Sequence, residues 1–96
     1  MKPIVIHPGE ILLGDFMMPV GLNCNTLALA IRVPSNRVLA ITKCKRAISA
    51  DTALRLARYF GTTPDFWMNL QALHDLKKAT FDSGAQIKRE VRPRAA

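Results

Sequence analysis

The sequence predicts an all-α fold built around two short helices joined by a tight turn. In the first, Leu27, Ala28 and Ile31 recur at helical spacing. Asn23 precedes them and has a short polar side chain that can accept hydrogen bonds from the free N–H groups at a helix start. The apolar spacing then breaks, and Pro34 suits the first turn of a second helix, where a missing N–H costs nothing. This second helix has a narrow apolar edge and shows small polar and basic residues outward, which is typical of a helix that lies in a groove.

Basic residues gather in the same stretch. The chain has 96 residues and a net charge of +7, and no Asp or Glu interrupts residues 23–46. A solvated basic face is the simpler interpretation of such a run taken alone. Because this basic run coincides with a helix–turn–helix pattern, DNA binding is the favoured function: Lys and Arg beside a helix that lies in a groove neutralise phosphates and release counterions. The basic residues of this stretch are Arg32, Arg37, Lys43, Lys45 and Arg46.

Composition narrows the class of protein further. The length suits one domain with a single small core. No apolar run approaches a membrane span and no signal peptide is evident, so a cytoplasmic protein is expected. Cys24 and Cys44 fit no zinc spacing with His7 or His74, so we expect free thiols, no metal and no cofactor. The sequence also has no convergent acid, base and nucleophile and no Gly-rich phosphate loop, which argues against an enzyme.

Caps and apolar spacing predict three further helices. One has Pro8 in its first turn and ends at Pro19-Val20-Gly21. Another follows Ser49, a good N-cap, and ends at Gly61, which suits a left-handed C-terminal cap. The last follows the N-cap Thr63. Five helices in total are therefore expected.

The predicted fifth helix carries candidates for self-association. Phe66, Trp67 and Leu70 recur at helical spacing, and core packing is the simpler interpretation, above all for Phe66 and Leu70. Two adjacent aromatic residues cannot both face one small core, however, so a second buried surface is expected here. In proteins that bind two-fold DNA sites such a surface is usually a dimer interface.

Residues 1–80 are expected to form the folded domain, and residues 81–96 a flexible basic tail. The tail, DSGAQIKREVRPRAA from Asp82 onward, contains Ser, Gly, Pro and charge but no periodic apolar face. Its basic residues can add loose phosphate contacts.

Several stretches carry a family resemblance. They include HPGEIL at residues 7–12, VPSNRV at 33–38 and KRAISADTALRLARYFGTTPDFWMNLQ at 45–71. Residues 7–78, roughly three quarters of the chain, resemble HigA-type antitoxins, also called virulence-associated protein I, of the lambda-repressor-like XRE helix–turn–helix superfamily. The resemblance implies a five-helix domain that binds double-stranded operator DNA as a homodimer. It also implies neutralisation of a HigB-type toxin, a small ribosome-dependent mRNA endonuclease.

The same resemblance implies which residues touch DNA. Base contacts fall at the start and middle of the second helix of the pair, where Asn36 can pair with adenine and Ala40 can touch a thymine methyl group. Ser35 lies beside them, and Arg37 can reach guanine or a phosphate. The expected phosphate contacts, which position the protein without reading sequence, are Asn23, Lys43, Lys45 and Arg46.

Two turns depart from the family's pattern. Arg32 stands where these proteins usually have glycine between the two helices, and Lys43-Cys44 stands where the next turn usually has Asn-Gly. A residue other than glycine at positive φ costs about 1 kcal/mol or more, so reshaped turns are expected. Two alternative functions stay open, namely a stand-alone XRE-type regulator without a toxin and a protein-interaction module with weakened DNA binding.

Overall fold

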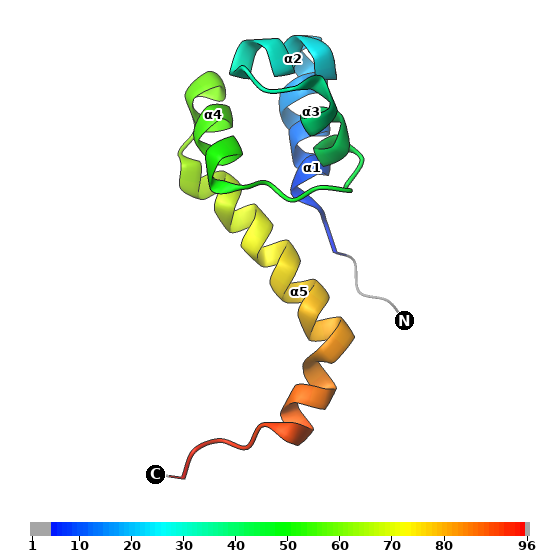
Figure 1. The fold of residues 1–96 in the computed structure, drawn as a ribbon, viewed down its shortest axis with the longest axis vertical. Coiled ribbons are helices and arrows are strands. Elements are labelled where there is room, and N and C mark those ends of the chain that lie inside the picture. Colours follow the sequence, from blue (N-terminus) through cyan, green and yellow to red (C-terminus); the bar gives the residue numbers. More distant parts are fainter. Residues whose placement is uncertain (1–4, 96) are drawn as a thin grey trace.

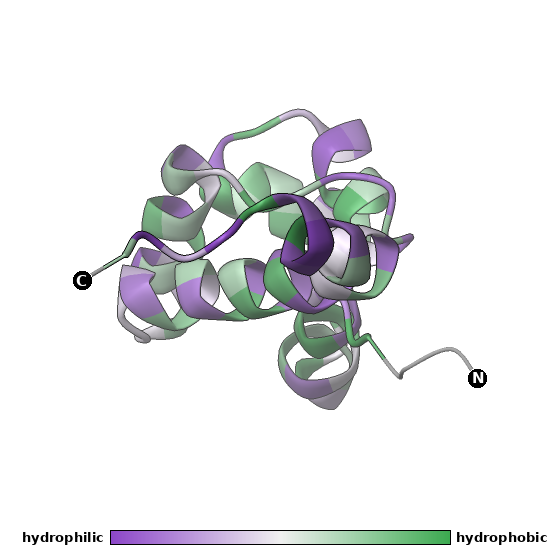
Figure 2. Ribbon diagram, turned by 90° about the horizontal axis from the view of Figure 1, so that it is seen from below, coloured by the Kyte–Doolittle hydropathy of each residue, from purple (hydrophilic) through white to green (hydrophobic). Residues whose placement is uncertain are grey.

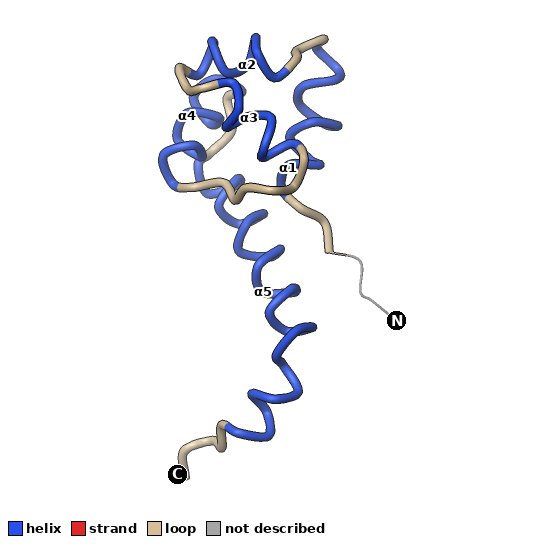
Figure 3. Tube along the Cα trace, turned by 45° about the vertical axis from the view of Figure 1, so that its right-hand side comes forward, coloured by secondary structure: helices blue, strands red, loops and turns tan. Residues whose placement is uncertain are grey.

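The computed structural model describes residues 5–95, which form helices and contain no strand (Figures 1 and 3). The predicted all-α class is confirmed. None of these helices combines the length and apolar character needed to span a bilayer. The elements in order are α1 (Pro8–Ile11), the π-helical η1 (Leu12–Met17), the 3-10 helix η2 (Met18–Val20), α2 (Cys24–Ile31), α3 (Ser35–Thr42), α4 (Ala50–Phe60) and α5 (Pro64–Glu90).

The helices begin and end largely where local sequence signals predict. The side chains of Asn23, Ser49 and Thr63 each accept a hydrogen bond from a backbone N–H in the first turn of the following helix. Gly61 closes α4 in the left-handed region, with a φ of 74°. Pro34 is the N-cap of α3 and not part of its first turn, because its ψ of 143° is extended.

The core lies where α1, η1, α2, α3, α4 and the first turns of α5 meet. Trp67, a predicted dimer-interface residue, belongs to this core and is fully buried within the chain. Its ring centroid lies 4.8 Å from that of Phe16, and its Nε1 donates to Oγ1 of Thr62 over 2.8 Å. The assignment of Trp67 to a second surface is therefore wrong, since no part of its side chain is left for a partner. The largest fully buried side chains include Leu12, Met17, Leu27, Ile41, Ile48, Leu56 and Trp67.

The end of α5 differs from the expected tail. The helix continues to Glu90, past the predicted boundary at residue 80, and projects from the bundle so that the molecule measures 52 × 31 × 21 Å (Figure 1). Its last turns carry strongly hydrophilic residues (Figure 2). Pairs four residues apart support this part: Nζ of Lys78 lies 3.8 Å from Asp82, and Gln86 donates to Glu90 over 2.7 Å. The helix thus continues through residues 81–90, where the apolar residues Phe81 and Ile87 are exposed, and within residues 81–95 only 91–95 lack regular structure.

Gly9 allows the start of α1 to contact the end of α3. A Cβ atom at this position would overlap the backbone carbonyl group of Ile41. The N–H of Gly9 donates to Nδ1 of the buried N-cap residue His7 over 2.9 Å, and the N–H of His7 donates to Glu10 over 3.2 Å. Burial and the nearby His74 lower the pKa of His7, against the opposing effects of Glu10 and Asp75, which favours the neutral ring that this hydrogen bond needs.

This contact predicts that Gly9→Ala destabilises the fold. The free energy of unfolding should fall by about 2 kcal/mol or more, because the Ile41 carbonyl is backbone and α3 must shift to admit a methyl group. Urea unfolding measures the change. Gly14→Ala is the matched control: no atom lies within 4 Å of its added Cβ, and it should stabilise the helix by up to about 1 kcal/mol. Equal urea midpoints for Gly9→Ala and the wild type would contradict the close contact.

Candidate nucleic-acid interface

Helices α2 and α3 form a helix–turn–helix with one exposed face on α3. Val38 and Ile41 bury the inner side of α3 in the core. Ser35 and Asn36, both predicted base contacts, are exposed, and Ala40 is half-buried beside them. These three residues therefore share one accessible surface. Leu39, which sequence reasoning missed, is 43% exposed and lies between Ser35 and Asn36 around the helix.

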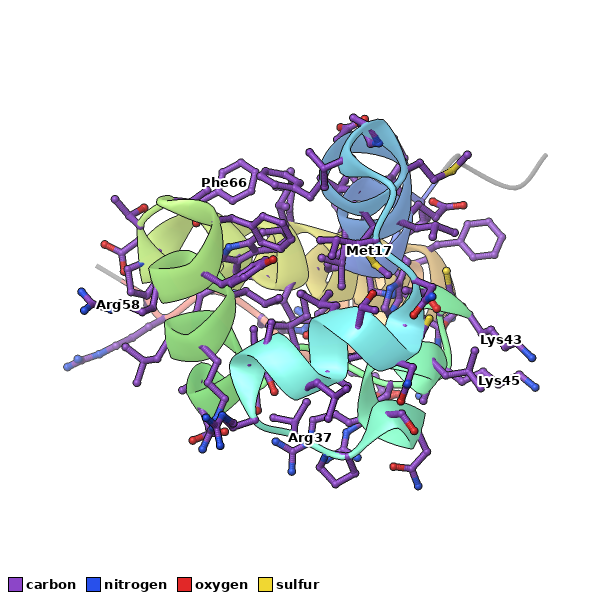
Figure 4. The ribbon with its side chains drawn as sticks, turned by 90° about the horizontal axis from the view of Figure 1, so that it is seen from above. Met17, Arg37, Lys43, Lys45, Arg58 and Phe66 are labelled. Atoms are coloured by element: carbon purple, nitrogen blue, oxygen red, sulfur yellow. The ribbon has the colours of Figure 1, made fainter. Side chains whose placement is uncertain are left out.

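Arg37 lies apart from that surface. It follows Asn36 by about 100° around the helix, which turns it toward α4. Its Nη1 lies 3.5 Å from Oδ2 of Asp51, and its Nε is buried without a hydrogen-bond partner among the described residues. Figure 4 shows Arg37 on a different side of the molecule from Lys43 and Lys45. The structure thus does not bring Arg37 together with the other predicted base contacts.

The predicted phosphate contacts lie close to the C-terminal end of α3. Lys43, Lys45 and Arg46 are exposed where α3 ends, and none of them pairs with an acidic side chain within residues 5–95. Lys43 and Lys45 extend outward next to each other (Figure 4). Asn23 has a second role as the N-cap of α2, in which its Oδ1 accepts from the N–H of Thr26 over 2.8 Å. Its exposed side chain keeps the amide NH2 group as a donor.

Both turns around α3 keep the left-handed conformation without glycine. Arg32 and Cys44 each have a φ of 62°, so the expectation of reshaped turns is wrong. The N–H of Val33 donates to the Ala28 carbonyl over 3.0 Å, and that of Lys45 donates to the Ala40 carbonyl over 2.9 Å. Both turns therefore keep the backbone hydrogen bond of a left-handed helix cap, although each carries strain of about 1 kcal/mol or more.

The cysteines lie close to this motif. Cys24 Sγ is 3.7 Å from Oγ1 of Thr42, which links the start of α2 to the end of α3. Cys44 is exposed, and slight burial of its thiol together with the nearby Glu10 raises the pKa of that thiol, which favours its protonated form. Within residues 5–95 no group of three His, Cys, Asp or Glu side chains is arranged to hold a metal ion.

The remaining interface candidates lie on α5. Phe66 is 37% exposed and Leu70 is half-buried. Leu70 and Leu73 line an apolar hollow of about 140 Å³ together with Ile6, Pro8 and Ile11. Leu73 and Leu76, at 54% and 66% exposure, extend the same surface along the helix.

Comparison with known proteins identifies the family. No family model matches the chain. Virulence-associated protein I of Dichelobacter nodosus is 48% identical over 77 residues, which are 80% of this chain and 71% of that protein. A solved addiction module antidote protein of a HigA family from Coxiella burnetii is 50% identical, with a TM-score of 0.89 over 98% of this chain and 100% of that one. Antitoxin HigA of Pseudomonas aeruginosa, solved with the higBA promoter, is 43% identical, with a TM-score of 0.93 over 96% and 100% of the two chains.

These similarities cover nearly the whole chain, and they include both the helix–turn–helix and the long α5. The protein belongs to the HigA family of addiction-module antidote proteins.

Proposed function

We propose that this protein binds operator DNA as a homodimer, represses transcription there and neutralises a HigB-type toxin. One observation carries the DNA-binding part: the exposed face of α3 lies beside Lys43, Lys45 and Arg46, which pair with no acidic side chain of the described residues. The Pseudomonas aeruginosa relative solved with its promoter supports the same activity here. The proposed mechanism is that α3 enters the major groove while the basic residues at its C-terminal end bind phosphates at the edge of that groove.

Base reading is assigned to the exposed face of α3. Asn36 pairs with an adenine, Ser35 bonds a neighbouring base edge and Ala40 contacts a thymine methyl group. Leu39, exposed between them, provides further apolar contact. Arg37 contacts DNA only after its ion pair with Asp51 breaks. Breaking this pair costs about 1 kcal/mol or less, because its two atoms lie 3.5 Å apart and the Asp51 side chain is largely exposed.

Phosphate contacts position α3 on the duplex. Lys43, Lys45 and Arg46 neutralise charge close to the end of α3, and Asn23 donates from the start of α2. The basic residues that follow in α5 and beyond it, including Lys88 and Arg89, are exposed and far along the projecting helix. They are assigned only non-specific attraction to DNA.

Self-association is assigned to the outer face of α5. Beyond Gln71 the helix has no buried residue, yet Leu73, Leu76, Phe81 and Ile87 are each 50% or more exposed. A projecting helix of this kind is marginal by itself, because helices derive most of their stability from packing an apolar face. A second copy of α5 would cover these residues together with Phe66 and Leu70, and a two-fold dimer matches a palindromic operator.

Operator binding is tested with a DNA fragment from the protein's own promoter and a scrambled fragment, at several salt concentrations. Wild type should prefer the promoter by about a thousandfold or more. Asn36→Ala should lose on the order of 1–3 kcal/mol of that preference. Lys45→Ala should weaken binding to both fragments and lower the magnitude of the salt slope by about one.

Arg58→Ala is the charge-matched control for Lys45→Ala. Arg58 is exposed on α4 and lies on the opposite side of the molecule from Lys45 (Figure 4), so its loss should leave the salt slope unchanged. If wild type bound both fragments equally and in a salt-sensitive way, the protein would have only a basic surface, and the proposed sequence-specific binding would be wrong. The protein-interaction module would then become the better explanation.

Leu73→Glu should convert the dimer to a monomer, because it places a charge in the proposed apolar interface. Light scattering after size exclusion measures the mass directly. Leu54→Glu is the matched control: Leu54 is 60% exposed on α4, close to the 54% of Leu73, and lies outside the proposed interface. A dimer that persists in Leu73→Glu, or one that is lost equally in Leu54→Glu, would exclude this face of α5.

Toxin neutralisation is tested by co-expression with the product of the neighbouring reading frame. That product should arrest growth when expressed alone, and this protein should restore growth and co-purify with it. Asn36→Ala should still restore growth, because the variant alters only the DNA-reading face. If the neighbouring product neither arrested growth nor bound this protein, the stand-alone regulator would be the better explanation. Such a regulator would still bind its operator.

A further inference from the structure

We propose that Arg55 of α4 is a positioning residue for operator binding, because it holds the turn at Arg32 in the conformation that glycine usually provides. The inference rests on the proposed function, since it assigns a role in DNA recognition to a side chain outside α2 and α3. Arg55 itself need not touch DNA in this role.

The guanidinium of Arg55 binds the end of α2. Its Nη1 donates to the backbone carbonyl oxygen of Ile31 over 2.9 Å and to that of Arg32 over 3.3 Å. Ile31 is the last residue of α2, and Arg32 is its left-handed C-cap. The last carbonyl groups of a helix have no partner within it, and they lie at the negative end of its dipole. A fixed guanidinium therefore satisfies both the hydrogen-bonding and the electrostatic demand of this turn.

The guanidinium is held in place from its other side. Nε of Arg55 donates to Oδ2 of Asp51, one helical turn earlier in α4, over 2.8 Å. Arginine suits this geometry because its rigid planar fork can bind a carboxylate and backbone carbonyls at the same time. A lysine ammonium group has no such fixed fork.

The turn at Arg32 needs this support. With a φ of 62° it adopts a conformation that glycine accepts freely and that a residue with a side chain adopts at a cost. Helix α3 begins at Ser35, so few residues separate the strained position from the proposed base contacts. A change of φ at Arg32 would swing the start of α3, and with it Ser35 and Asn36.

The same carboxylate also reaches α3. Oδ2 of Asp51 lies 3.5 Å from Nη1 of Arg37, which is in the first turn of α3. Asp51 and Arg55 therefore join the first two turns of α4 to both sides of the helix–turn–helix, namely the end of α2 and the start of α3. The hydrogen bonds of Arg55 to the end of α2 are the ones that hold the turn, because the Asp51–Arg37 pair is weak.

The test compares four full-length proteins: wild type, Arg55→Met, Arg32→Gly and the double variant. Methionine keeps the apolar stem of Arg55 and removes only the guanidinium. Hydrogen exchange of the Val33 amide, without DNA, reports on the turn, because this N–H donates to the Ala28 carbonyl over 3.0 Å. The Cys44 amide, which donates to the Ile41 carbonyl over 3.0 Å in the other left-handed turn, is the internal control for general destabilisation.

In Arg55→Met the Val33 amide should exchange roughly tenfold faster than in wild type, with the Cys44 amide as the reference. The preference for promoter over scrambled DNA should fall by roughly tenfold. Arg32→Gly should restore both values in the double variant, because glycine holds the turn without support. Arg32→Gly alone should change neither by more than about twofold. Arg58→Met replaces a neighbouring arginine that forms no ion pair within residues 5–95. This variant should match wild type in both amide exchange and promoter preference.

Unchanged Val33 exchange in Arg55→Met would overturn the proposal, as would a loss that Arg32→Gly does not restore. Altered Val33 exchange with an unchanged promoter preference would also overturn it, because the turn would then not position α3. The exchange measurement requires no DNA. If wild type showed no preference for the promoter, only the proposed function would be contradicted. The exchange rate of the Val33 amide would still show whether Arg55 holds the turn.

Discussion

The position of α3 depends on backbone geometry at its two ends. Both adjoining turns are left-handed, at Arg32 and Cys44, although neither residue is glycine. Between these turns, Gly9 brings the start of α1 against the carbonyl of Ile41, where a side chain has no room. The helix that carries the proposed base contacts is thus confined by close contacts and strained turns, and pre-organisation of this kind reduces the cost of binding.

The other helices have separate structural roles. Helices α1 and α4 pack against the inner side of the helix–turn–helix and leave the polar face of α3 free. The first turns of α5 complete the core through Trp67 and Gln71, whose Oε1 accepts from the N–H of Ile48 over 2.8 Å. The rest of α5 leaves the bundle with its apolar residues uncovered. The core, the proposed DNA-reading face and most of the proposed self-association surface therefore occupy different parts of the chain.

Local signals in the sequence are sufficient to predict most of the helix boundaries. Asn23, Ser49, Thr63 and Gly61 act within one turn of their own positions, so their capping roles require no tertiary information. The burial of Trp67 depends instead on the arrangement of Phe16 and Thr62, which are contributed by other segments. The contact of Arg55 with Ile31 spans 24 residues and has no local signal at all. The exposed face of α3 was predictable from helical spacing, whereas the turning of Arg37 toward Asp51 was not.

The burial of Trp67 has a practical consequence. It is the only tryptophan of the chain, and its side chain has no exposed surface. Its indole lies in the core beside the rings of Phe16 and Phe66, at centroid distances of 4.8 Å and 5.0 Å. Intrinsic fluorescence excited at the indole band therefore reports the loss of core packing in this domain. An optical probe of unfolding is thus built into the chain, and it requires no label on either of the surfaces proposed to bind partners.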